Sequence, residues 1–305
     1  MTEILALGEP LVEFVRLPDP VDGRAVYRQG FGGDTSNAII AAARQGAKTG
    51  YVTAVGGDPF GAALMELWQD EGVDTTTVQT RPQDPTGVYF VQPHASGRSF
   101  SYARRGSAAS LYGPDDLPLD AIRAARVLHV SALSQAVSGA MRAAVRRASE
   151  VARAAGVLVS FDTNLRLNLW TLDEARAAIF DLLPLADIVM PSDDEAATLL
   201  GTTNEAAILA RFGAQGARVV ILKRGARGPL IRAGGETFEV PVPQVSAVDS
   251  TGAGDSFAGA WLAYYLETGD ARIATDRAAR VAAGTVSGYG AVDPIPRRAE
   301  VLAAQ

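Results

Sequence analysis

The sequence predicts an α/β fold in three layers, with a mostly parallel central sheet that helices cover on both faces. Short apolar, β-rich runs alternate along the chain with Ala-rich segments of helical periodicity. Continuous apolar strands between helices are typical of a parallel sheet that is buried on both faces. The expected strands are residues 4–7, 51–55, 127–130, 157–161, 188–190 and 219–222, and the expected helices include 36–45, 61–71, 139–155 and 173–183.

Two segments interrupt this alternation. Residues 87–104 read as two antiparallel strands around a Gly-containing turn, and residues 13–30 carry two prolines and an Asp-Gly turn signal. A period of two would place Phe100, Tyr102 and Arg104 on one face. We expect the two segments to form a small sheet that acts as a lid. The alternative is a pair of surface excursions without function.

Composition excludes several classes of protein. The 305 residues fit one large α/β domain or two domains, and the net charge of −6 argues against a nucleic-acid or anionic-membrane surface as the main partner. Without cysteine, disulfides and thiolate metal sites are excluded, and two histidines cannot build a multi-His metal cluster. Because we find neither a long apolar run nor a signal-like N-terminus, we expect a cytoplasmic location.

The most informative stretch is Val-Asp-Ser-Thr-Gly-Ala-Gly-Asp-Ser-Phe-Ala-Gly at residues 248–259. Its Gly252-Ala253-Gly254 turn opens a helical pattern, and backbone N–H groups at a helix start form an anion site. Asp255 then places a carboxylate where an anion would bind. Taking the proton from a hydroxyl that attacks a phosphoryl group would give it a role. The alternative is a helix capped by small residues with an acidic first turn.

Polar residues follow other elements at positions where ligands of parallel sheets bind. Gly33 belongs to a glycine pair that permits close backbone approach to a ligand. Asp34 and Asn37, which follow it, can hydrogen-bond sugar hydroxyls. The alternative is that Asp34 or Ser36 caps the next helix.

Arg166 follows the expected strand 157–161, together with Asp162 and Asn164. An arginine there can clamp a carboxylate or a phosphate with two N–H donors. The alternative is a surface arginine paired with a nearby aspartate.

Two further loops suit a nucleotide. The first loop holds Ser192 and Glu195, which fit a capping box at the start of a helix. In the functional alternative, Glu195 lies near the magnesium shell of a nucleotide. Lys223, Gly225 and Gly228 suit a polyphosphate, although a plain strand-ending turn explains the glycines equally well. The sequence lacks GxxxxGK[ST], HRD, DFG and GxGxxG signatures, so a P-loop enzyme, a protein kinase and a dinucleotide oxidoreductase are poorly supported.

Together, these residues resemble the ribokinase family of sugar kinases, also called the phosphofructokinase-B family, over nearly the whole chain. Asp-Ser-Thr-Gly-Ala-Gly-Asp at 249–255 looks like the family's carboxy-terminal signature, and Gly32-Gly33-x-x-x-Asn37 like its amino-terminal one. The resemblance implies one ribokinase-like kinase domain over residues 1–305, with lid segments at about 13–30 and 87–104.

The resemblance also implies roles for site residues. Asp255 would be the base, and Gly252, Ala253 and Gly254 the anion hole. ATP and Mg²⁺ would be bound, with Glu195 acting on the metal indirectly. A K⁺ effect is implied near Asp249 and Thr251, and a homo-oligomer through the lid. The nucleotide would contact Ser192, Lys223, Gly225, Gly228, Gly252 and Gly254.

Four pieces are similar to the 2-keto-3-deoxygluconate kinases of that family: Gly-Glu-Pro-Leu-Val at 8–12, Gly-Phe-Gly-Gly-Asp-Thr at 30–35, Phe-Asp-Thr-Asn-Leu-Arg and the following Leu-Trp within 161–170, and Leu-Lys-Arg-Gly-Ala at 222–226. The similarity implies that a sugar acid contacts Gly33, Asp34, Asn37, Tyr89, Tyr102, Arg104, Arg166 and Asp255. The sequence departs from the pattern at Leu165, Ser192, Ala279 and Ala291.

We therefore expect ATP-dependent phosphorylation of the terminal 6-hydroxyl of 2-keto-3-deoxygluconate. A fructokinase or another neutral-sugar kinase is the alternative within the family, and Arg104 and Arg166 would then be structural. A non-catalytic, sugar-sensing protein is a third possibility. The intact Asp255 argues against it, because a sensor needs no base.

Overall fold

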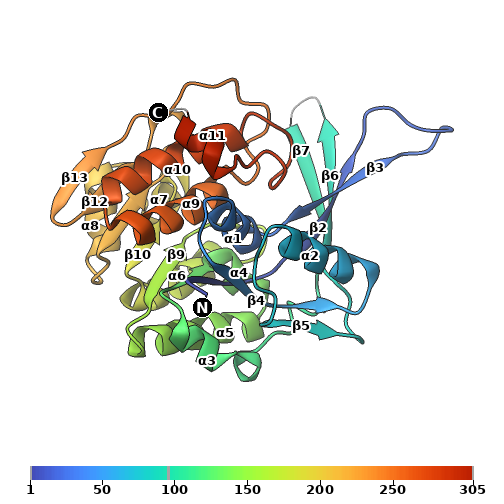
Figure 1. The fold of residues 1–305 in the computed structure, drawn as a ribbon, viewed down its shortest axis with the longest axis horizontal. Coiled ribbons are helices and arrows are strands. Elements are labelled where there is room, and N and C mark those ends of the chain that lie inside the picture. The colour runs from blue at the N-terminus through green and yellow to red at the C-terminus, as the bar shows by residue number, and fades with distance from the viewer. Residues whose placement is uncertain (1, 95–96, 304–305) are drawn as a thin grey trace.

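A nine-stranded sheet forms the centre of the computed structural model, which describes residues 2–94 and 97–303 (Figure 1). In spatial order the strands are β13 (Glu236–Glu239), β12 (Leu230–Ala233), β11 (Val219–Leu222), β10 (Ile188–Met190), β9 (Leu158–Asp162), β8 (Val127–Ser131), β1 (Ile4–Leu7), β4 (Thr49–Gly56) and β5 (Val78–Arg81). In this order, neighbouring strands are parallel from β11 through to β5, whereas β12 and β13 form an antiparallel edge next to β11.

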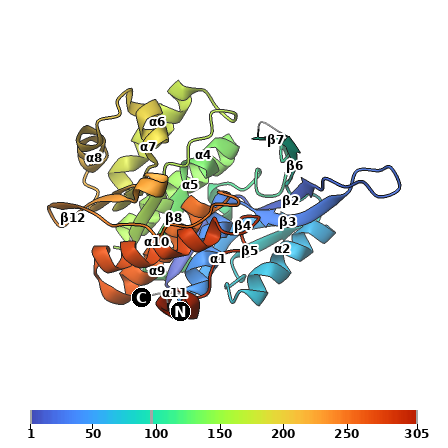
Figure 2. The same cartoon turned by 90° about the horizontal axis from the view of Figure 1, so that it is seen from above.

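Helices cover both faces of this sheet, which confirms the predicted three layers (Figure 2). Successive strand side chains point to opposite faces, so Leu5 and Leu7 join one apolar core whereas Ile4 and Ala6 join the other. The first core is closed by α3 (Leu119–Ala124), α4 (Ala132–Val137), α5 (Gly139–Ala154), α6 (Leu172–Leu182), α7 (Asp193–Leu200) and α8 (Glu205–Gly213). The second is closed by α1 (Asp34–Arg44), α2 (Pro59–Asp70), α9 (Ala253–Thr268), α10 (Ala271–Thr285) and α11 (Arg298–Ala303).

A second sheet, here called the small sheet, projects from one end of the molecule (Figure 1). Its order is β3 (Tyr27–Gly32), β2 (Leu11–Arg16), β6 (Val88–His94) and β7 (Gly97–Ala103). The two irregular segments thus pair with each other as predicted, although residues 95 and 96 of the expected turn lie outside the described residues. Phe100 and Tyr102 share a face with Tyr89, whose ring contacts both.

The sequence-based predictions differ from the structure mainly at the edges of the sheet. The strands β5, β12 and β13 were not predicted, because they are short and, in β5 and β13, rich in polar residues. Within residues 2–94 and 97–303, no helix combines the length and the apolar character that crossing a membrane requires.

Candidate active site

The first turn of α9 presents free backbone donors. Gly252 precedes the helix with a φ of 76°, and a Cβ there would lie 2.8 Å from the carbonyl oxygen of Ala291, so only glycine fits without strain. The N–H of Ala253 has Ser250 as a weak acceptor at 3.3 Å. Among the described residues, no acceptor faces the N–H groups of Gly254 and Asp255. These donors, at the positive end of the helix dipole, can bind an anion.

Asp255 lies beside this anion site and is held by α1. The Nδ2 of Asn37 donates to Oδ2 of Asp255 at 2.9 Å. The contact requires close packing of α1 against α9, since a Cβ on Gly259 would lie 1.8 Å from the carbonyl oxygen of Ala38. Burial and, to a smaller extent, the nearby Asp34 carboxylate raise the pKa of Asp255 to about 7.

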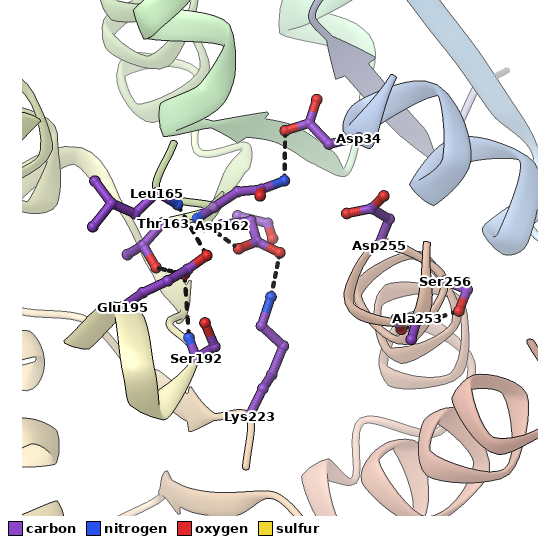
Figure 3. Close-up of polar contacts among 12 residues, drawn as sticks. Asp34, Asp162, Thr163, Leu165, Ser192, Glu195, Lys223, Ala253, Asp255 and Ser256 are labelled. Carbon is purple, nitrogen blue, oxygen red and sulfur yellow. Dashed lines mark hydrogen bonds and ion pairs between the residues drawn. The ribbon is translucent and has the colours of Figure 1, made fainter. Parts of the chain in front are cut away.

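Asp34 faces the same space as Asp255 (Figure 3). Its Oδ2 accepts a hydrogen bond from Nδ2 of Asn164 at 3.0 Å, and its Oδ1 accepts one from the N–H of Thr35 at 2.8 Å. Asn164 adopts a φ of 21°, an unusual value for a residue with a side chain. The carboxyl end of β9 is therefore tied to the first turn of α1.

The alternative prediction that Asp34 or Ser36 caps the helix after the glycine pair is wrong. Gly33 is the N-cap of α1, with a φ of 106°, and no side chain caps the helix. Ser36 instead accepts a hydrogen bond from the indole N–H of Trp68 at 2.9 Å. Gly33 also approaches the backbone of Glu9, where a Cβ would lie 2.5 Å from the carbonyl oxygen.

Lys223, which follows β11, reaches the same centre from the opposite side (Figure 3). Its Nζ donates to Oδ2 of Asp162 at 2.6 Å and lies 3.4 Å from the position of a Cβ on Gly254. The ammonium group thus borders the anion site of α9. Gly225 and Gly228 have positive φ values of 54° and 78°, as a tight turn requires, and their contact with a nucleotide stays a prediction.

Glu195, at the start of α7, has both carboxylate oxygens engaged by the chain. Oε2 accepts from Oγ1 of Thr163 at 2.9 Å and from the N–H of Ser192 at 3.5 Å, and Oε1 accepts from the N–H of Leu165 at 3.0 Å. Within the described part of the chain, no group of three His, Cys, Asp or Glu side chains could hold a metal. The indirect role of Glu195 in binding Mg²⁺ stays a prediction.

Arg166 lies at the edge of this centre, with 48% of its side chain exposed. Its Nη1 donates to the carbonyl oxygen of Leu165 at 2.8 Å and to Oε1 of Glu195 at 3.4 Å. Nε and Nη2 have no partner among residues 2–94 and 97–303. The nearby carboxylate is therefore a glutamate rather than an aspartate, and two donors remain for a ligand.

Arg104 has a partner that the sequence analysis missed. Its Nε donates to Oε1 of Glu9 at 3.2 Å, and its Nη2 bonds the second oxygen of that carboxylate. Glu9 is fully buried, and burial raises its pKa to about 7 even though Arg104 opposes the shift. Its place two residues after the end of β1, at the sheet edge where ligands bind, was a usable signal.

The small sheet brings two more predicted residues to the centre. The hydroxyl of Tyr89 donates to Oε2 of Glu13 at 2.5 Å, and the rings of Tyr89 and Tyr102 stack 5.9 Å apart. Glu13, on β2, was predicted only as the start of a lid segment. Its pairing with Tyr89 depends on strand register, which the sequence does not reveal.

Asp249 and Thr251 organise the loop before α9. Oδ1 of Asp249 accepts from the hydroxyl of Thr251 at 2.6 Å, and Oδ2 accepts from the N–H of Gly290 at 3.0 Å. The monovalent-cation role of these residues stays a prediction. Ala291 packs against Gly252, and Ala279 is buried in α10.

A buried carboxylate beside a helix-start anion site, at the strand ends of a parallel sheet, is suited to phosphoryl transfer. The family model for pfkB family carbohydrate kinases matches residues 1–298, and the chain belongs to that family. It is a carbohydrate kinase with a ribokinase-like fold.

Individual relatives differ in their sugars. The 2-dehydro-3-deoxygluconokinase of Thermoproteus tenax is 35% identical over 99% of this chain and 94% of its own length. The fructokinase of Solanum tuberosum is 34% identical over 98% of this chain and 94% of its own length. An Escherichia coli structure designated ribokinase II, in complex with ATP and Mg²⁺, has a TM-score of 0.91 and 29% identity over 99% of this chain and 98% of that one.

Proposed function

We propose that this sugar kinase phosphorylates the 6-hydroxyl of 2-keto-3-deoxygluconate, the compound also called 2-dehydro-3-deoxygluconate, with ATP as donor. The observation that carries the proposal is the half-exposed Arg166, whose Nε and Nη2 groups remain available at the edge of the site. A sugar acid brings a carboxylate that loses water in a closed site and needs such a partner. The Thermoproteus tenax relative supports the same substrate.

In the proposed reaction, Asp255 accepts the proton of the 6-hydroxyl as the hydroxyl oxygen attacks the γ-phosphorus. The bond between that phosphorus and the leaving ADP oxygen breaks in the same step. The free N–H groups of Gly254 and Asp255, with Lys223 beside them, stabilise the charge that develops on the phosphoryl oxygens. Mg²⁺, when bound with ATP, would neutralise phosphate charge.

A fructokinase activity is the second candidate, and one contact favours it. The guanidinium of Arg104 is committed to Glu9, so only one of the two predicted arginines is free to meet a sugar carboxylate. The Solanum tuberosum relative supports this alternative.

We also propose that residues 1–305 form one kinase domain whose small sheet closes over the sugar. Exposed Tyr27 and Phe90, whose rings contact each other on β3 and β6, support an oligomer that forms through this sheet. A K⁺ ion near Asp249 and Thr251 is part of the same proposal.

The value of kcat/KM for the sugar is expected to rise with pH through about 7. Only the deprotonated form of Asp255 can accept a proton, and its pKa lies at about 7 in the free enzyme. Below that pH, kcat/KM should fall about tenfold per pH unit. Initial rates between pH 5.5 and 8.5 (roughly the range that brackets such a base) test this, and a flat profile would contradict it.

Replacing Arg166 with Ala is expected to lower kcat/KM for 2-keto-3-deoxygluconate about ten- to hundredfold, because a charge-assisted contact contributes about 1.5–3 kcal/mol. The rate with fructose should barely change, since fructose has no carboxylate. ADP release across a panel of sugars and sugar acids measures both.

Arg123→Ala is the matched control, because Arg123 is 49% exposed and pairs with Asp120 on distant α3. Equal losses for both sugars in the Arg166 variant would assign this residue to the fold or to the nucleotide, and the sugar-acid proposal would fail.

A further inference from the structure

Each cation around the catalytic centre already contacts a carboxylate of the chain. Lys223 pairs with Asp162 and Arg104 with Glu9. Arg166 contacts Glu195 through Nη1 alone, and its other donors are assigned above to the sugar carboxylate. Asp34 and Asp255 add negative charge without a cationic partner of their own. A nucleoside triphosphate brings several more negative charges to this place, and Mg²⁺ bound with it would offset only part of them, so a further cation would stabilise it.

Arg28, on β3 of the small sheet, is a cation that pairs with no carboxylate of the described residues. In the pairing of β2 with β3, Arg28 lies opposite Val15, and Gly30 lies opposite Glu13. Each residue of the first pair is two positions along its strand from a residue of the second pair, so Arg28 and Glu13 lie on the same face of the sheet. That face also carries Tyr89, which contacts Glu13. Among residues 2–94 and 97–303, Arg28 has no hydrogen bond or ion pair through its exposed guanidinium.

The guanidinium of Arg28 lies close to the loop that packs against the N-terminus of α9. Its Nη2 lies 3.9 Å from the position of a Cβ on Gly290. Gly290 donates its N–H to Asp249, and the next residue, Ala291, packs directly against Gly252. The loop between α10 and α11, which holds Gly290, lies beside the small sheet (Figure 1).

We propose that Arg28 is a further catalytic residue, which supplies positive charge to the transferred phosphoryl group of the nucleotide. A guanidinium offers a planar set of donors that matches phosphate oxygens. Along β3, Gly30 and Gly32 follow Arg28 on the same face, so no side chain of that strand stands between Arg28 and the first turn of α1. The proposal rests on the kinase activity of the family, and it is independent of which sugar is phosphorylated.

The test compares Arg28→Ala and Arg28→Lys with Arg24→Ala, all assayed with ATP, Mg²⁺ and whichever sugar of the panel is phosphorylated best. Arg24 is the matched control because it is also exposed, on the connection that leads from β2 into the strand of Arg28. We expect Arg28→Ala to lower kcat/KM for ATP about ten- to hundredfold. Arg28→Lys should recover part of the loss, and Arg24→Ala should match the unchanged enzyme.

A second measurement separates chemistry from folding. Guanidinium ion at concentrations that leave the protein folded should partly restore turnover of Arg28→Ala, and the melting temperature of that variant should be unchanged. Turnover of Arg28→Ala equal to that of Arg24→Ala, or a loss that guanidinium does not restore, would overturn the proposal. Failure with 2-keto-3-deoxygluconate alone, while another sugar reacts, would instead reject the proposed substrate.

Discussion

Asp255→Asn is expected to reduce kcat about 10²–10⁴-fold, the range for loss of a general base, while ATP still binds. The substituted amide has the same shape, and its oxygen can still accept the hydrogen bond from Asn37. It cannot accept a proton from the sugar hydroxyl. Initial rates of ADP formation by the purified variant measure the effect.

Stability gives an independent check on the same variant. The pKa of Asp255 is raised in the folded protein to about 7, so above that pH the folded state carries a charge that the unfolded chain holds at lower cost. Removing this charge should leave the melting temperature at pH 8 (a value chosen about one unit above that pKa) unchanged or higher. Asp120→Asn, on the exposed surface of α3, is the control for both assays. A kcat close to that of the unchanged enzyme would remove Asp255 from the mechanism.

Gly259→Ala is expected to lower the free energy of unfolding by about 1–3 kcal/mol, the usual range for overpacking a well-packed core. The added Cβ would lie 1.8 Å from the carbonyl oxygen of Ala38, and this backbone atom can move only if α1 and α9 separate. Their separation would lengthen the contact between Asn37 and Asp255, so kcat should fall as well. Denaturant unfolding and steady-state rates measure the two effects.

Gly139→Ala is the matched control for this substitution. Gly139 begins α5, and no atom lies within 4 Å of a Cβ built there. Because alanine is the better helix former, its stability should stay the same or rise by up to about 1 kcal/mol. Equal unfolding midpoints for Gly259→Ala and Gly139→Ala would contradict the packing argument.

The sequence by itself determined the fold class and where along the chain the chemistry lies. Apolar runs such as β10 and β11 are buried on both faces of the sheet, so their hydrophobicity is continuous and visible without a structure. The turn at Gly252 is a local feature, since its φ of 76° reflects a residue type that tolerates this conformation.

Only the tertiary structure decided which charged groups meet. The partners that define the centre are far apart in sequence: 61 residues for Lys223 and Asp162, 95 for Arg104 and Glu9, and 218 for Asn37 and Asp255. Periodicity and local motifs carry no information on such distances, because these pairs depend on the order of strands in the sheet and on how closely α1 packs against α9. Strand order also explains why Arg104, predicted as a sugar ligand, is bound by a carboxylate of its own chain, whereas Arg28 is not.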